Sequence, residues 1–172
     1  LWRPPLPRPP AARRGGRGHW VAEGLPGGIG SDQSRHPLAT KRKPHPASPS
    51  GMPGGQTLLP LMLNHVAHHR LTLRRLVDLT SAGPQRLFGL VRKGRIAVGY
   101  DADFTIVDLK ARWTIEQDWL ASRCGWSPFT GETLTGKPIG TIIRGAQVMW
   151  DGTLADKATG APFRFDATDR PA

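Results

Sequence analysis

The sequence is short of cysteine and of long hydrophobic runs. Cys124 is the single cysteine among 172 residues, which excludes an intramolecular disulfide and a cysteine-rich zinc site. No window approaches the ~20 consecutive apolar residues of a membrane-spanning helix, and the first residues lack the apolar core of a signal peptide. These absences predict a soluble protein of a reducing, cytoplasmic compartment.

Acidic residues are also few. The chain has 13 Asp and Glu against 24 Lys and Arg, for a formal charge of +11. Residues 1–50 hold 9 basic and 2 acidic side chains, a balance of +7, whereas residues 51–172 hold 15 and 11, a balance of +4. The strong basic character therefore belongs mainly to the first part of the chain.

Residues 1–28 contain proline and arginine/glycine clusters and no apolar period of 2 or 3.6 residues. Such a segment buries too little apolar surface to offset its ordering entropy, so we predict a disordered head. Two binding hypotheses stay open: PPLPRPP as a polyproline II ligand of an SH3-type partner, and RRGGRG as an RNA-binding tract. Unchanged retention on RNA at low salt after deletion of residues 1–28 would exclude the second.

The main chemical candidates lie in residues 29–63. Asp32 follows an apolar and glycine run typical of the end of a buried strand, and His36 lies in a loop because Pro37 follows it. A strand end can present such a carboxylate as a metal ligand or a proton acceptor. An Asp and a His in one loop also cap turns or lie in solvent, so their spacing alone leaves both interpretations open.

The residues that follow predict three helices. Apolar side chains near a period of 3.6 predict the first over residues 56–69. Thr72 is the expected N-cap of the second, and residues 81–89 form the third, with Pro84 in its first turn and Gly89 as its C-terminal cap.

The pattern changes from residue 93 onward to short strands between turn residues. Strands are predicted over residues 104–107 and 113–116, and residues 139–150 predict a hairpin with Gly145 in its turn. Short strands of this kind favour a small β-sandwich over a parallel sheet.

Three groups of side chains admit a functional and a structural interpretation. His65 and His69 could form a metal pair, but the glutamate of an HExxH site is absent, which favours a solvated helix end. Asp101 and Asp103 could also form a metal pair, but they are better explained by a turn in which the carboxylates accept hydrogen bonds from the turn's own backbone amides. Basic residues do not alternate with the aromatic ones, which favours a packed core over a base-stacking surface. These aromatic residues are Trp113, Trp119, Trp126, Phe129 and Trp150.

Several stretches resemble dihydroorotase-type cyclic amidohydrolases. GSDQSRH is similar to the segment after the eighth barrel strand, where Asp-His-Ala-Pro-His is usual, and PHPASPSGMPGGQTLLPLMLNHV to the loop and helix that follow. The likeness continues in the same order through SAGPQRLFGL, KGRIAVGYDADFTIVDL and SRCGWSPFTGETLTGKPIGTIIRGAQVMWDG. It covers about residues 28–165, and several motifs in one order are far more specific than any one of them.

The resemblance implies zinc-dependent hydrolysis of a cyclic amide, dihydroorotate or N-carbamoyl-aspartate in the reverse direction, in pyrimidine synthesis. In this family a metal centre opens at the C-terminal end of a TIM barrel and lowers the pKa of the attacking water. Asp32 matches the family's metal ligand and proton carrier. His36 matches a histidine that contacts the substrate carboxylate, and Ser50 and Gly51 match backbone positions that contact the substrate.

The sequence departs from the family pattern in two ways. Gln33, Ser34 and Arg35 replace the usual His-Ala-Pro, which can displace His36. The family's His-x-His, its bridging carboxylated lysine or aspartate and its two later histidines would precede residue 28 and have no counterpart here. Because a binuclear site needs several preorganised ligands, we expect this chain alone to bind no catalytic zinc and to hydrolyse nothing.

Together these observations predict an α/β fragment: the last βα unit and closing helices of a TIM barrel, followed by a small β-sandwich. The expected parts are a head over 1–28, the active-site loop with its helices over 29–92, the sandwich over 93–165 and a tail over 166–172. An allantoinase- or hydantoinase-type enzyme and a non-catalytic partner of aspartate transcarbamoylase remain alternatives. A homo-oligomer is also open, whereas nucleic-acid and membrane partners are not expected.

Overall fold

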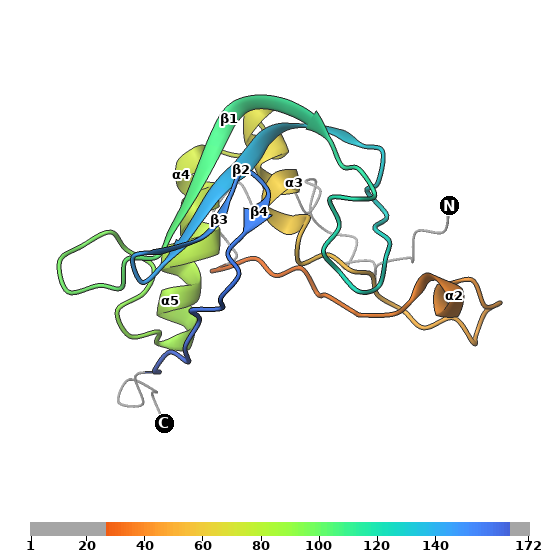
Figure 1. Cartoon of the computed structure of the whole chain (residues 1–172), viewed down its shortest axis with the longest axis horizontal. Coiled ribbons are helices and arrows are strands. Elements are labelled where there is room, and N and C mark those ends of the chain that lie inside the picture. The colour runs from red at the N-terminus through yellow and green to blue at the C-terminus, as the bar shows by residue number, and fades with distance from the viewer. Residues whose placement is uncertain (1–26, 166–172) are drawn as a thin grey trace, which may run out of the picture.

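The computed structural model describes residues 27–165, so most of the predicted head and all of the predicted tail lie outside the described residues, as do the SH3-ligand and RNA-binding tracts. Figure 1 shows the helices packed on one sheet, with a long excursion that carries the first short helix away from the body. Among residues 27–165, no helix combines the length and the apolar character that crossing a membrane requires. The elements are α2 (Leu38–Lys41), α3 (Leu58–Ala67), α4 (Leu73–Val77), the π-helix η1 (Asp78–Ala82), α5 (Gly83–Phe88), β1 (Phe104–Thr114), β2 (Thr133–Ile143), β3 (Ala146–Trp150) and β4 (Thr153–Leu154).

The four strands form one antiparallel sheet in the order β1-β2-β3-β4. β1 runs through the first predicted strand and into the second as far as Thr114, so the two are one strand. Its register with β2 shifts between Asp108 and Arg112. Asp108 Oδ1 accepts hydrogen bonds from the backbone N–H groups of Lys110 and Ala111, at 2.8 and 3.0 Å. The Asp108 carboxylate therefore accepts hydrogen bonds from two backbone N–H groups that the register shift leaves outside the β1–β2 pairing.

The predicted hairpin is confirmed, and the predicted sandwich is met only in part. Arg144 and Gly145 link β2 to β3 with φ of 50° and 82°, the two left-handed residues that such a turn needs. A sandwich has two packed sheets, whereas residues 27–165 form a single sheet. The inner face of this sheet packs on α3. The helix therefore covers the face that a second sheet would cover in a sandwich.

The largest group of buried side chains lies between α3 and the helical run that follows it. Ile29, Leu58, Leu59, Val66 and Val107 pack against this group, which gives it a contribution from β1 as well. The predicted apolar face of α3 is confirmed by this packing. The buried members are Met62, Leu63, Leu71, Leu76 and Leu79.

The contact between α3 and β2 is unusually close. Gly136 has a φ of 99°, and a Cβ built there would lie 2.7 Å from Cβ of Leu63. One residue earlier, the backbone N–H of Thr135 donates to Asn64 Oδ1 at 3.0 Å. Together these contacts fix both the separation and the register of α3 on the sheet.

The two ends of the helical run over residues 72–89 agree with the sequence prediction. Thr72 Oγ1 accepts a hydrogen bond from the N–H of Arg75 at 3.1 Å, which makes Thr72 the N-cap. Gly89 ends the run in the left-handed conformation, with a φ of 59°.

The prediction of two separate helices within this run is wrong. The N–H of Gly83 donates to the carbonyl of Asp78, five residues back, so η1 joins α4 to α5 without a break. Pro84 lacks an N–H, and in an α-helix its ring would collide with the carbonyl of Thr80. A π turn is wider than an α turn, and it accommodates the proline inside a continuous helix.

The predicted aromatic core is confirmed for one pair. The rings of Trp113 and Trp119 meet edge to face with centroids 4.8 Å apart, and Trp113 Nε1 donates to the carbonyl of Gly136 at 3.0 Å. Trp150 instead lies on the outside of the sheet, where its exposed ring covers Gly140. The aromatic residues therefore do not form one cluster, because the sheet separates them.

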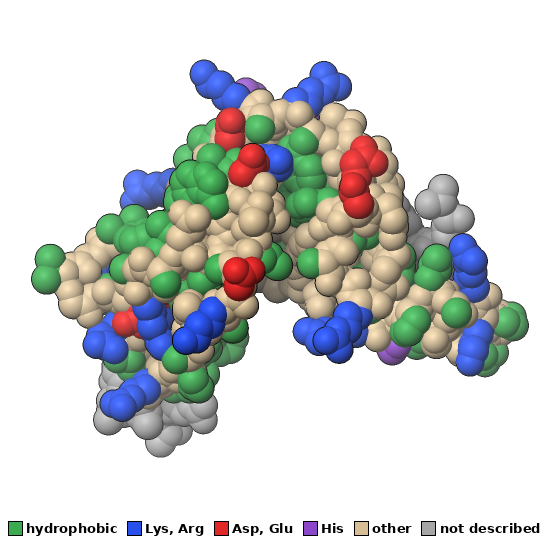
Figure 2. Space-filling model, in the orientation of Figure 1, with side chains coloured by type: hydrophobic (Ala, Val, Ile, Leu, Met, Phe, Trp, Pro, Cys, Tyr) green, Lys and Arg blue, Asp and Glu red, His purple; other side chains and the backbone are tan. Residues whose placement is uncertain are grey.

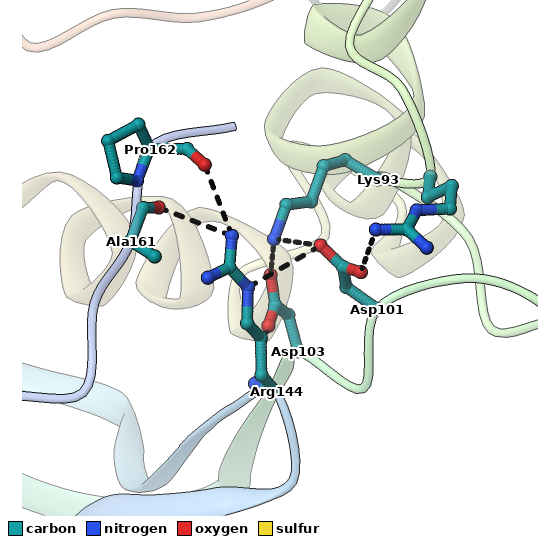
Figure 3. Close-up of polar contacts among 7 residues, drawn as sticks. Lys93, Asp101, Asp103, Arg144, Ala161 and Pro162 are labelled. Carbon is teal, nitrogen blue, oxygen red and sulfur yellow. Dashed lines mark hydrogen bonds and ion pairs between the residues drawn. The ribbon is translucent and has the colours of Figure 1, made fainter. Parts of the chain in front are cut away.

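A cluster of opposite charges ties the start of β1 to the β2–β3 turn (Figure 3). Lys93 Nζ contacts Asp101 Oδ2 at 2.9 Å and also Asp103 Oδ2. Asp103 Oδ1 accepts the backbone N–H of Arg144 at 2.8 Å, and Arg92 Nη2 lies 3.5 Å from Asp101 Oδ1. The two carboxylates thus pair with cations instead of forming a metal pair. The backbone N–H that Asp103 accepts belongs to Arg144 in the β2–β3 turn. The prediction that these carboxylates bond to amides of their own turn is therefore wrong.

The same cluster shifts the pKa values of its members. The hydrogen bond from Lys93 lowers the pKa of Asp101 below its ordinary value of 3.8. Burial acts to raise the pKa of Asp103, but hydrogen bonds from Lys93 and from the Arg144 amide lower it overall. Hydrogen bonds to Asp103 and Asp101 raise the pKa of Lys93. All three groups are therefore charged across the neutral pH range.

Lys93→Gln should lower the free energy of unfolding between about pH 5 and pH 9, because it leaves both aspartates without their shared cation. The depressed pKa values of Asp101 and Asp103 mean that their contribution is lost as the pH falls below about 4, so the difference from the native chain should shrink there. Urea denaturation at pH 3 and pH 7 measures this, with Lys157→Gln, an exposed lysine, as the control. A difference that stays equal at both pH values would contradict the ion-pair assignment.

Gly136→Ala should destabilise the fold by about 2–4 kcal/mol, because alanine is strained at this positive φ and its Cβ would press on Leu63. Gly30→Ala is the matched control, since a Cβ at Gly30 would meet no atom within 4 Å. Urea denaturation at neutral pH measures both variants. Equal midpoints for the two would show that α3 can move away from β2 at no cost.

Candidate functional site

The segment that carries Asp32 is an irregular loop and not a strand end. The N–H of Ile29 donates to the carbonyl of Leu79 at 3.2 Å, and Gln33 forms one isolated parallel bridge with Met52. Asp32 itself has a φ of 48° and an exposed side chain. The predicted strand is therefore wrong here, because a strand needs a hydrogen-bonded neighbour along its length and the described residues provide one at a single point.

The two loops that hold the predicted site residues lie side by side. The N–H of Ser34 donates to the carbonyl of Met52 at 3.0 Å, and the N–H of Gly55 donates to Gln33 Oε1. Gly51 has a φ of 87° and lies so close to Ser34 that a Cβ there would collide with the Ser34 side chain. The structure thus brings the loop of Asp32 against the loop of Gly51, and this approach requires a glycine.

A third segment, residues 119–127, covers the same region. Trp126 Nε1 donates to the backbone carbonyl of His36 at 2.8 Å. Gln56 Nε2 donates to the carbonyl of Trp119 at 2.7 Å, and Gln56 Oε1 accepts from the N–H of Ala121 at 2.9 Å. The sequence predicts Gln56 as the first residue of a helix and Trp126 as part of an aromatic core, and it marks neither as a site residue, although both lie in stretches that carry the family resemblance. Their bonding partners are distant in sequence, so no local pattern marks them.

A cleft of about 800 Å³ lies between these segments. Gln33, Arg35 and Pro37 line it from the first loop, whereas Asp32 and His36 do not. Neither Ser50 nor Gly51 lines it. Alternate residues of this irregular loop thus reach the cleft. None of the predicted catalytic and substrate-binding residues therefore belongs to the cleft that the described residues form.

Asp32 lies without the neighbours that a metal centre needs. Within residues 27–165, no three His, Cys, Asp or Glu side chains are grouped so that they could hold a metal ion. Two metal ions need several ligands held in place together. The residues that the structure describes thus do not fit the binuclear centre that the resemblance implies.

His65 and His69 do not form a pair on one helical face, because His65 lies in α3 and His69 lies beyond its end. α3 ends two residues before His69, whose φ of 57° turns the chain away from the helix. Burial, together with the charges of Arg70 and His68, lowers the pKa of His65. His68 and His69 are exposed, as predicted for a solvated helix end, but His65 is neutral at pH 7 and adds no positive charge there.

The sequence profile of the amidohydrolase family matches residues 20–148, a match that begins somewhat before residue 28. The dihydroorotase of Methanothermobacter thermautotrophicus is 41% identical over 128 residues, which are 74% of this chain and 30% of that protein. The dihydroorotase of Halobacterium salinarum is 38% identical over 161 residues, which are 94% of this chain and 37% of that protein. The chain thus spans about a third of the length of these relatives.

Solved structures give the same result. The L-hydantoinase (dihydropyrimidinase) of Arthrobacter aurescens superposes with a TM-score of 0.76 at 35% identity, over 80% of this chain and 32% of that one. A D-hydantoinase (dihydropyrimidinase) of a Thermus species superposes with a TM-score of 0.75 at 29% identity, over 81% and 32%. Since the family profile covers most of its length, this chain belongs to the amidohydrolase family and contains the part that corresponds to about a third of a full relative.

Proposed function

We propose that this chain is the C-terminal portion of a dihydroorotase-like, metal-dependent cyclic amide hydrolase of the cytoplasm, and that it is inactive alone. The identity to dihydroorotases reaches 41%, whereas the matched part spans 30% of the relative's length. In the complete protein Asp32 would serve as metal ligand and proton carrier, with His36, Ser50 and Gly51 in contact with substrate.

The observation that carries this proposal is the isolation of Asp32. Its motif lies in a loop that packs on the Gly51 loop, and this packing supports the proposal that both loops belong to one site. No group of three potential metal ligands exists in the described part of the chain. One carboxylate cannot hold two zinc ions, so the ligands of a working centre must come from outside these residues.

An apolar face that is exposed in the described part of the chain supports the proposal that a further part of the protein packs here. On the run from α4 to α5, Leu76 and Leu79 are buried, whereas Val77 is 52% and Phe88 is 63% exposed, and Leu73 is also exposed. Leu73 and Val77 lie four residues apart in α4, about one helical turn, which puts these two on one side. In Figure 2 hydrophobic side chains gather on the visible surface where β1 passes in front of α4, so the face of the helical run is defined by the exposed fractions given above. Such a face marks an interface. We propose that the rest of a TIM barrel packs on it, with this run as the closing helices and the sheet as part of a sandwich.

Identity favours dihydroorotate over the alternatives. The dihydroorotase relatives reach 41% identity, whereas the hydantoinase structures reach 35%. An allantoinase- or hydantoinase-type substrate is therefore the second choice. A non-catalytic partner of aspartate transcarbamoylase is a further candidate, because the isolation of Asp32 fits it equally well. Co-purification with a transcarbamoylase subunit would favour that role.

The chain alone, supplied with zinc, should show no hydrolysis of dihydroorotate and no tight zinc binding, because Asp32 has no companion ligands. A colorimetric assay of N-carbamoyl-aspartate with a parallel zinc titration measures this. The full-length dihydroorotase of Methanothermobacter thermautotrophicus is the positive control. Turnover that disappears in Asp32→Asn would contradict the proposed inactivity.

Co-expression with the preceding two-thirds of that dihydroorotase should restore turnover of dihydroorotate, because the missing ligands then surround Asp32. Asp32→Asn should abolish the restored activity, whereas Asp156→Asn, an exposed acid elsewhere, should retain it.

Val77→Ser should weaken the assembly, and Leu154→Ser, which is 67% exposed, is its matched control. Faster turnover of hydantoin or allantoin would favour the alternative enzymes. No turnover of any of the three would count against the enzyme proposal.

A further inference from the structure

The cleft between the Asp32 loop and residues 119–127 carries two arginines and no acid. Arg35 lines it from one side and Arg123 from the other, and no Asp or Glu is among its lining residues. Both side chains are exposed, and neither makes a hydrogen bond or an ion pair within the described part of the chain. Two guanidinium groups thus share one cavity, and no acidic side chain of residues 27–165 lines it.

The glutamines of the cleft have their acceptor atoms occupied. Gln33 Oε1 accepts the N–H of Gly55, and Gln56 Oε1 accepts the N–H of Ala121 at 2.9 Å. Gln56 Nε2 donates to the carbonyl of Trp119 at 2.7 Å, whereas no contact engages Gln33 Nε2 within the described residues. The amide group that remains free is therefore a donor.

The serine side chains of the cleft also accept hydrogen bonds from backbone N–H groups. Ser122 Oγ accepts the N–H of Cys124 at 3.3 Å, and Ser127 Oγ accepts the N–H of Phe129 at 3.2 Å. Each hydroxyl uses its oxygen in this way and keeps its proton to donate. The glutamine and serine side chains of the lining thus offer donors, and the two guanidinium groups are positively charged donors. Among the hydroxyls, Thr57 differs, because its Oγ1 donates to the carbonyl of Gly54 at 3.3 Å and keeps its oxygen as an acceptor.

We propose that this cleft binds a small molecule that carries oxyanion groups, phosphate or carboxylate, between Arg35 and Arg123. A guanidinium binds either group through two parallel hydrogen bonds, which are stronger than bonds between neutral partners. A cleft of about 800 Å³ lies within the range that small-molecule sites occupy. Arg35 stands where the family pattern has proline, and Asp32 and His36 do not line the cleft, so this site is independent of the proposed hydrolase centre.

Calorimetric titration of the full chain with inorganic pyrophosphate and with succinate tests the site. Saturable binding of one anion per chain is expected, and Arg35→Gln and Arg123→Gln should each weaken it by about tenfold or more. Arg74→Gln removes one exposed charge on α4 and should change it by less than about twofold. Tighter pyrophosphate binding identifies a phosphorylated ligand, and tighter succinate binding identifies a dicarboxylate. Equal weakening in all three variants, or no saturable binding, would overturn the proposal.

The single cysteine gives an independent measurement, because Cys124 lines the same cleft. The anion that binds more tightly, at saturation, should slow the alkylation of Cys124 by N-ethylmaleimide several-fold in the native chain and in Arg74→Gln. The same anion concentration should give no protection in Arg35→Gln. Circular dichroism spectra that match the native chain confirm that each variant folds. Calorimetric binding without protection of Cys124 would place the anion elsewhere and refute the site.

Discussion

The close contact of α3 with β2 is the constraint on which the rest of the structure depends. Gly136 lets the strand approach Leu63, and the bond from Thr135 to Asn64 fixes the register of this approach. This contact joins the region predicted as barrel helices to the region predicted as a sandwich. The sheet therefore uses a helix as its second layer, and a separate partner sheet is not needed for its inner face.

The site region follows from the same packing. The packing of α3 also fixes the residues just before it. Among them, Gln56 bonds to the segment of Trp119 and Ala121. That segment in turn presents Trp126 to the carbonyl of His36. Three stretches that are far apart in sequence thus meet around one cleft, whose lining is basic although the family motif nearby is defined by an acid.

Local signals predicted the local features well. The N-cap Thr72, the cap Gly89 and the hairpin turn at Gly145 each depend on the conformation of a few adjacent residues, so short patterns identify them. The π turn before Pro84 was missed, because it results from a proline that a continuous helix must accommodate. The division of the aromatic residues by the sheet was missed too, because it depends on packing between distant strands.

The sequence by itself determined the family, the identity of Asp32 as the acid of the motif and the local caps and turns, since each is encoded by residue types at short spacing. Only the tertiary structure decided that Asp32 is exposed and without a group of ligands, that alternate residues of its loop reach the cleft, and that Arg35 faces the same cavity as Arg123. These outcomes depend on which distant segments meet. Such meetings are set by the packing of α3, Gly136 and the covering loop together, and no single stretch of sequence contains them.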